Sequence, residues 1–226
     1  MKYLSAVVAL GALLLAAQPA GAASIVNGDF EQGPYGPSDP PFSFVTLGSG
    51  DTSINGWTVG GAGVDYIGDY WYDHTLGVGE NGHSIDMSAL SAGSLTQQLT
   101  GLVVSQTYRV SFWMSGNPEG GAGSRSLQVA ATGNPSSGTL SVIVAAAAGP
   151  HPYTLNWTQF YYDFTATASS AALTFTSLEN NPFGPALDDV SISAVPIPAA
   201  LPLFASGLAA FGVFARRRRK AAAVQA

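Results

Sequence analysis

Three consecutive aromatic side chains lie in a loop that carries a carboxylate on either side. The segment reads Gly68-Asp69-Tyr70-Trp71-Tyr72-Asp73-His74. Sugar rings present apolar C–H faces that stack on aromatic planes, while carboxylates accept hydrogen bonds from sugar hydroxyls. Because consecutive side chains cannot all enter one core, we expect at least one ring to be exposed. Trp71 is the expected stacking residue, since indole has the largest flat face, and Asp69 or Asp73 would orient hydroxyls. The alternative is that these rings pack beneath the loop.

The rest of the chain offers few patterns for catalysis. Gly77-Val78-Gly79-Glu80-Asn81-Gly82 matches a dinucleotide-binding glycine pattern, but a strand rather than a helix is predicted after it, so we expect no nucleotide site. His74, His83 and His151 lack metal-ligand spacing, and there is no G-x-S-x-G sequence. The absence of cysteine excludes thiol catalysis and disulfides. A glycosidase needs two carboxylates across a cleft, and the sequence marks no such pair.

The elements that must position these residues read as strands. Every second residue from Tyr108 to Met114 is apolar or aromatic, and Phe160, Tyr162 and Phe164 share a face. No stretch keeps a helical apolar period over three turns. The sequence therefore predicts an all-β domain, a jelly-roll β-sandwich. The predicted strands are Ser24–Phe30, Trp57–Val59, Val64–Ile67, His83–Met87, Gly93–Leu99, Thr107–Met114, Ser126–Ala131, Thr139–Ala145, Asn156–Thr165, Ala171–Ser177 and Leu187–Ser193.

Motifs along the whole domain, taken in order, resemble the choice-of-anchor C family. Val26-Asn27-Gly28-Asp29-Phe30-Glu31 stands near the start, and Gly184-Pro185-Ala186-Leu187-Asp188-Asp189-Val190-Ser191-Ile192 near the end. Between them lie Gly56-Trp57, Val64-Asp65-Tyr66-Ile67, Gly82-His83-Ser84-Ile85-Asp86-Met87 and Gly93-Ser94-Leu95-Thr96-Gln97-Gln98-Leu99. The resemblance covers Ser24 to Ser193. It implies a galactose-binding-like jelly roll, related to plant cell-wall proteins of unknown function.

The same resemblance implies that the first and last strands lie side by side, where a structural calcium ion can join them. Calcium binds roughly six to eight oxygen atoms. Asp29 and Glu31, two apart on an extended segment, are expected to point to one side. Asp188 and Asp189 would point to opposite sides, so that one of them faces the first pair. A divalent ion would remove the repulsion among these carboxylates. The alternative is that these acids are solvated residues at strand ends.

Both ends of the chain carry patterns of export. Residues 1–23 combine Met1-Lys2, a short apolar core and Ala20-Gly21-Ala22-Ala23, which is typical of a secretory signal peptide. At the other end, the apolar run from Ala199 to Ala215 is long enough to cross a bilayer. A basic cluster follows it and would hold that end in the cytoplasm. The cluster consists of Arg216, Arg217, Arg218, Arg219 and Lys220.

The C-terminal layout resembles the PEP-CTERM sorting signal of Gram-negative bacteria, in which an exosortase reads a Pro-x-Pro motif, a transmembrane helix and an arginine cluster. The motif here is Val195-Pro196-Ile197-Pro198, with Ile197 in the usual place of glutamate. The resemblance implies transient inner-membrane anchoring, cleavage near Pro196 by an exosortase-like membrane protease, and delivery to the cell surface or extracellular matrix. We therefore divide the chain into a signal peptide (1–23), a domain (24–194), a sorting signal (195–220) and a tail (221–226).

The domain between these signals is strongly acidic. It keeps only Arg109 and Arg125 as basic residues against all fourteen acidic residues of the chain. Such a charge excludes nucleic acid and anionic lipid as partners. Three functions remain: non-catalytic binding of extracellular polysaccharide, a structural matrix or adhesion role with a protein partner, and glycoside hydrolysis. The resemblance and the sorting signal favour the first.

Overall fold

The computed structural model describes residues 23–35, 43–72, 74, 82–134, 138–146 and 150–196. The predicted signal peptide up to residue 22, Asp73, Ile197, Pro198 and the arginine cluster Arg216–Arg219 lie outside the described residues, so the predictions made for them stay predictions. Within the described part, no helix is long and apolar enough to span a membrane.

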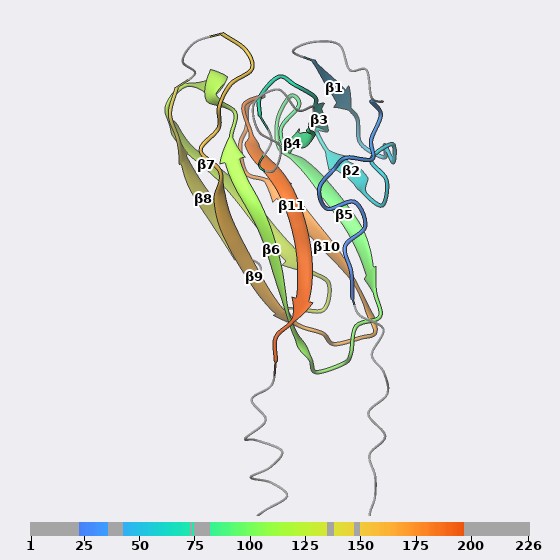
Figure 1. Ribbon diagram of the computed structural model, residues 1–226. Helices are drawn as coiled ribbons and strands as arrows, with labels where there is room; N and C mark the ends of the chain where they lie inside the picture. Colours follow the sequence, from blue (N-terminus) through green and yellow to red (C-terminus); the bar gives the residue numbers. More distant parts are fainter. Residues whose placement is uncertain are drawn as a thin grey trace, which may run out of the picture.

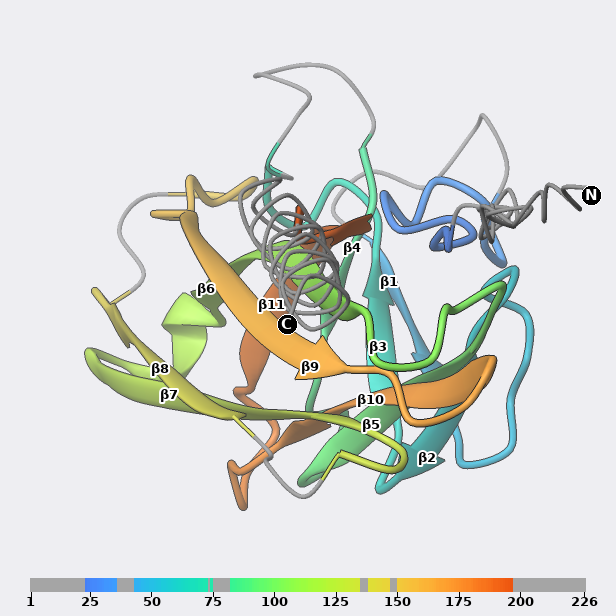
Figure 2. The same cartoon turned by 90° about the horizontal axis from the view of Figure 1, so that it is seen from below.

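Two antiparallel sheets pack face to face (Figure 1). The larger sheet has the order β1-β3-β4-β11-β6-β9 and the smaller one β2-β5-β10-β7-β8. Figure 2 shows the two layers from below. The strands are β1 (Phe44–Leu47), β2 (Thr58–Gly61), β3 (Val64–Ile67), β4 (Ser84–Asp86), β5 (Gly93–Thr100), β6 (Thr107–Gly116), β7 (Gly123–Ala131), β8 (Gly138–Val144), β9 (Thr158–Thr165), β10 (Ser170–Ser177) and β11 (Pro185–Ala194). The described residues hold one short 3₁₀ turn, Pro118–Gly120, and no α-helix.

The strand pairing identifies the sandwich as a jelly roll. Strand β4 pairs with β11, β5 with β10, β6 with β9 and β7 with β8. Four strands thus pair in reverse order with the next four, as in a long hairpin folded over into two sheets. Strands β1 and β3 extend the larger sheet and β2 extends the smaller one. The predicted all-β jelly roll is therefore confirmed.

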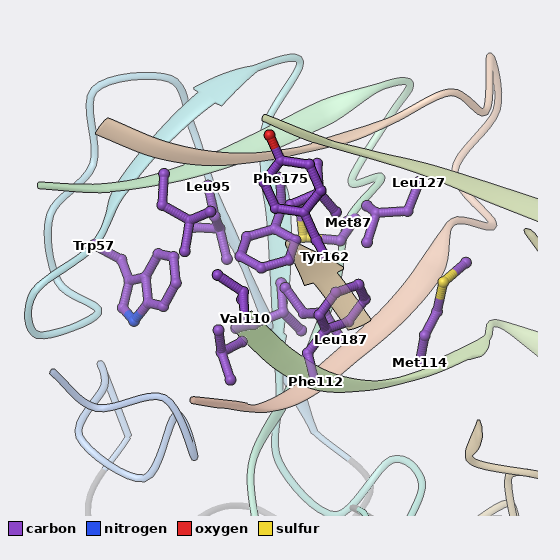
Figure 3. Close-up of a cluster of buried hydrophobic side chains, with 14 of the residues drawn as sticks. Trp57, Met87, Leu95, Val110, Phe112, Met114, Leu127, Tyr162, Phe175 and Leu187 are labelled. Atoms are coloured by element: carbon purple, nitrogen blue, oxygen red, sulfur yellow. The ribbon is translucent and has the colours of Figure 1, made fainter. Parts of the chain in front are cut away.

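Alternation along the strands fills the space between the sheets. On β6, the side chains of Tyr108, Val110, Phe112 and Met114 are at most 3% exposed, as the sequence predicted. Phe112 of the larger sheet meets Phe175 of the smaller one edge to face, with ring centroids 5.1 Å apart. Figure 3 shows both rings within the cluster of buried side chains. Such contacts between sheets hold the two layers together.

Two segments differ from the predicted strands. Ser24–Phe30 turns instead of extending, because Asn27 and Phe30 have φ angles of 50° and 56°. The Asn27 side chain stabilises the turn: its Nδ2 donates to the Gln32 carbonyl (2.9 Å) and its Oδ1 accepts from the Gln32 amide (2.8 Å). Phe44–Leu47 was not predicted and forms β1. Its pattern is weak because only one of its four residues is buried.

The N-terminal turn nevertheless lies beside the last strand, as the family resemblance implied. The Val190 amide donates to the Gly28 carbonyl at 2.8 Å. A Cβ on Gly28 would stand 1.9 Å from the Val190 carbonyl oxygen, so glycine is required at this close approach. On the other side, Trp57 Nε1 donates to the Asn27 carbonyl at 3.0 Å. The two ends of the domain are therefore joined directly.

Replacing Phe175 by alanine should remove a ring that contacts both Phe112 and Trp57. We expect the free energy of unfolding to fall by about 3–5 kcal/mol, the cost of emptying a phenylalanine site in a core. Urea unfolding followed by circular dichroism measures this loss. Ile143→Ala is the control: that side chain is 77% exposed, and its removal should change stability by about 0.5 kcal/mol or less. Equal losses in the two variants would contradict the assignment of Phe175 to the core.

Candidate functional site

A pocket of about 300 Å³ opens at one end of the sandwich, and we call it the end pocket. It lies where β1, β3 and β4 approach the turn Pro118–Gly120 and the residues before β11. Its aromatic lining includes Phe44, Tyr70 and Phe183. Its polar lining includes Thr46, Asp65, Asp86, Asn117 and Glu119. The pocket therefore combines flat apolar rings with hydrogen-bonding groups.

Two rings and one carboxylate form a rigid wall of the end pocket. Phe44 is 46% exposed and packs edge to face on Tyr70, with ring centroids 5.3 Å apart. Tyr70 donates from its hydroxyl to Glu119 Oε2 at 3.0 Å, and Tyr153 donates to Glu119 Oε1 at 3.2 Å. Burial, together with the Glu119 carboxylate, raises the pKa of Tyr70 to about 12. The phenol therefore stays protonated and keeps its donor role at physiological pH.

The Asp86 carboxylate fixes the deepest part of the end pocket. It is 1% exposed and accepts from Asn117 Nδ2 (2.9 Å), the Ser88 amide (3.0 Å) and the Gly184 amide (3.0 Å). Burial raises the pKa of Asp86 to about 8, against the opposing effect of these three donors. A Cβ on Gly184 would lie 2.5 Å from Asp86 Oδ1, so glycine lets the backbone approach. Asp86 thus joins its own segment, which includes Ser88, to the segments that contain Asn117 and Gly184.

A second carboxylate lies beside the first, because Asp65 on β3 is paired in register with Asp86 on β4. Asp65 is 8% exposed and accepts from Thr46 Oγ1 at 2.6 Å. Burial raises the pKa of Asp65, and its charge contributes to the raised pKa of Asp86. Asp65 and Thr46 add a carboxylate and a hydroxyl to the lining of the end pocket.

The structure corrects the role expected for Trp71. The indole is 1% exposed, its Nε1 donates to Ser84 Oγ at 2.8 Å, and it belongs to a small apolar cluster with Leu155 and Ala186. The expectation of an exposed stacking face is therefore wrong for this residue. A run of three aromatics does not reveal which ring turns inward, and here a satellite core beneath the loop takes the largest one.

The neighbours of Trp71 are anchored by the backbone. Two of the three aromatics, Tyr70 and Trp71, line the end pocket, but the Trp71 side chain is buried. Tyr72 is half-buried; its amide donates to the Tyr153 carbonyl at 3.0 Å, and its carbonyl accepts from Trp157 Nε1 at 3.1 Å. Asp69 accepts from the Ser43 amide at 3.2 Å. These bonds hold the loop in place.

The acids predicted to bind calcium occupy different surroundings. Asp29 is exposed, whereas Glu31 accepts from the His83 amide at 2.7 Å and contacts its Nδ1 at 2.8 Å. No group of three or more His, Cys, Asp or Glu residues that could hold a metal occurs in the described part of the chain. Calcium binding stays a prediction.

Asp188 and Asp189 do not point to opposite sides, contrary to expectation. Both contact His74: its amide donates to Asp188 Oδ2 at 3.0 Å, and its Nδ1 lies 2.6 Å from Asp189 Oδ2. The pairing of β11 with β6 shifts register between Asp188 and Ser191, and Asp189 has a φ of 48°. A β-bulge of this kind breaks the simple alternation on which the expectation depended.

Sequence reasoning missed Phe44, Asp65, Asp86 and Asn117. The sequence did contain a signal for the two aspartates, because each is the one charged residue of a short strand. The structure shows that both strands are buried at every residue. A charged residue in such a strand needs hydrogen-bonding partners. Nothing in the sequence identified those partners.

Residues 23–193 match a family described as a protein of unknown function, DUF642. The chain belongs to the DUF642 family. This confirms the expected relation to a plant cell-wall-related family of unknown function. The narrower resemblance to choice-of-anchor C proteins stays a prediction.

The DUF642 domain also resembles a segment of halomucin from Haloquadratum walsbyi, with 30% identity over 187 residues. That alignment covers 79% of this chain and 2% of halomucin, so the chain spans a small fraction of this relative. Among solved structures, a CBM4 module has 19% identity and a TM-score of 0.40, with 76% of this chain and 99% of the module covered. The CBM22 xylan-binding domain of Paenibacillus barcinonensis has 16% identity and a TM-score of 0.39, with 69% and 95% covered. Likenesses at such scores carry no argument about a ligand of the DUF642 domain.

The raised pKa of Asp86 should make the stability of the DUF642 domain depend on pH. Between its ordinary value of 3.8 and about 8, the folded protein holds a proton that the unfolded chain releases. The free energy of unfolding should therefore fall as pH rises through this range. The raised pKa of Asp65 acts in the same direction. Urea unfolding at a series of pH values should show this slope, and Asp86→Asn should flatten it.

Asp163→Asn is the matched control for the pH experiment. Arg109 lowers the pKa of Asp163, so its contribution to stability changes below about pH 4. This variant should keep the slope between pH 5 and pH 8. A slope that persists unchanged in Asp86→Asn would show that Asp86 does not cause it.

Proposed function

We propose that this DUF642 domain is a non-catalytic carbohydrate-binding module and that the end pocket holds a terminal sugar residue of a polysaccharide. The observation that carries the proposal is the exposed Phe44 ring at the pocket, next to the Asp65 and Glu119 carboxylates. Sugars need this combination, since their C–H faces stack on rings while their hydroxyls bind carboxylates and amides. The volume of about 300 Å³ lies at the small end of ligand pockets, which suits a chain end better than a long chain.

The charge of the end pocket favours a neutral sugar. No arginine or lysine lines the pocket. Arg109 donates from Nε and Nη2 to Asp163, and Arg125 is 6% exposed and donates to the Asn117 and Gly121 carbonyls. Both arginines of the domain therefore bind groups of the domain itself. A uronic acid or sulfated sugar would meet carboxylates without a compensating cation.

The bonding of Asp86 supports a binding role over hydrolysis. A glycosidase acid must present its proton to the glycosidic oxygen. Both oxygens of Asp86 instead accept from groups of the protein, which gives this carboxylate a structural use. Release of reducing sugar from a polysaccharide would favour the hydrolase alternative, and retention of matrix proteins in place of glycans would favour the adhesion alternative.

The proposal includes export of the domain and its release by an exosortase-like protease. The support is the residue pattern at the two ends of the chain together with the position of the last backbone contact. The Val195 amide donates to the Thr107 carbonyl at 2.8 Å, immediately before Pro196. Cleavage near Pro196–Pro198 would therefore leave β11 and its pairing intact.

Phe44→Ala should weaken binding of neutral glycans by about 1–3 kcal/mol, the effect of losing one well-placed aromatic contact. Glycan-array screening followed by affinity electrophoresis in the polysaccharide selected would measure the loss. Leu178→Ala is the control, because its side chain is 46% exposed, as Phe44 is, and does not line the end pocket. Equal binding by Phe44→Ala and wild type, at equal melting temperatures, would rule out the end pocket as the site.

The form of the protein found outside the cell should lack everything after about Val195–Pro198. Intact-mass analysis of secreted protein gives the answer directly. The expected mass is that of a chain from about residue 24 to this motif. Secreted protein that still contains Phe204–Lys220 would refute processing at the Pro-x-Pro motif.

A further inference from the structure

A groove separate from the end pocket runs along the outer face of the larger sheet. It measures about 460 Å³ and shares no lining residue with the end pocket. One side is formed by the N-terminal turn, with Asp29 and Gln32, and the floor by β6, β9 and β11, with Trp113, Gln159 and Asp189. The groove exists because the N-terminal turn is held beside β11 by the bond from Val190 to Gly28.

The lining of this groove suits a polyhydroxylated ligand. The lining includes two carboxylates, three side-chain amides and a single indole, and no lysine or arginine takes part. In the register of the larger sheet, Trp113 lies between Gln159 on β9 and Asp188 on β11. The indole therefore has hydrogen-bonding groups on both sides of it. Anionic ligands are disfavoured by Asp29 and Asp189, and an apolar ligand would remove these two carboxylates from water.

An imidazole ring already occupies the indole face. His74 stacks on Trp113 with ring centroids 3.6 Å apart and planes inclined by 18°. The Nδ1 atom of the same ring lies 2.6 Å from Asp189 Oδ2. A flat ring on an indole, with a polar atom at its edge bound to a carboxylate, reproduces the contacts that a protein makes with a pyranose.

We propose that Trp113 and Asp189 form a second glycan subsite, on the outer face of the larger sheet, which His74 occupies in the unliganded protein. A neutral sugar ring displaces the imidazole, stacks on Trp113 and donates a hydroxyl hydrogen bond to Asp189. His74 therefore competes with the sugar for the indole face. The apparent affinity for the sugar is the intrinsic affinity multiplied by the fraction of molecules in which His74 leaves the indole uncovered. The subsite shares the ligand class of the proposed function but does not depend on the end pocket.

Replacing His74 tests the proposal through a gain of affinity, which a misfolded variant would not show. The measurements use isothermal titration of the purified protein with cello-, xylo- and galacto-hexasaccharides, in a Phe44→Ala background that weakens binding at the end pocket. His74→Ala should bind about fivefold more tightly than the background protein, the factor that corresponds to one lost hydrogen-bonded contact of typical strength. Trp113→Ala should reduce binding to what the weakened end pocket retains.

His151→Ala is the matched control, since this imidazole also contacts aromatic rings, those of Tyr70 and Tyr153, whereas His74 stacks on Trp113. It should leave binding in the Phe44→Ala background unchanged. The proposal is overturned if His74→Ala binds no more tightly, if Trp113→Ala retains full affinity, or if no hexasaccharide binds in the Phe44→Ala background. Loss of all binding in that background, with binding kept by wild type, would leave the end pocket standing as the single site.

Discussion

The arrangement of the end pocket depends on the hydrogen bonds to Asp86. Its carboxylate holds the Ser88 and Gly184 amides and the Asn117 side chain. Asn117 in turn accepts from the Glu119 amide and caps the 3₁₀ turn, which places the Glu119 carboxylate between the hydroxyls of Tyr70 and Tyr153. The aromatic wall is thus connected to a buried carboxyl group through a continuous series of bonds. A buried carboxylate is costly, and it is tolerated here because it organises several segments at once.

The strands were predictable because a sandwich buries one face of each strand. This requirement produces the alternation seen in β6 and β9, and it located ten of the strands from the sequence to within a few residues. The prediction failed where contacts with other residues override the local pattern. Ser24–Phe30 has suitable residues for a strand, but the Asn27 side chain bonds to the backbone of Gln32 and favours a turn. The bulge at Asp189 could not be predicted either, since it belongs to a register shift between β11 and β6, two strands distant in the sequence.

The candidate site was predictable only in part, for a similar reason. A loop with three aromatics indicated the right region, and Tyr70 does line the end pocket. Which ring enters the satellite core depends on Leu155 and Ala186, more than eighty residues further along the chain. The partners of Asp86 also come from distant segments, Asn117 and Gly184. Local patterns report the burial of a residue, whereas a site depends on contacts between segments that the fold brings together.

The topology also decides which way the end pocket faces. Strand β11 begins at Pro185, next to the Gly184 amide that binds Asp86, and ends at Ala194 at the opposite end of the sandwich (Figure 1). Ten extended residues span about 33 Å. The chain therefore leaves the domain far from the end pocket, and any attachment through the residues after Pro196 would leave the pocket facing away from it. If the domain is anchored through those residues, as proposed, the attachment and the end pocket lie at opposite ends of β11.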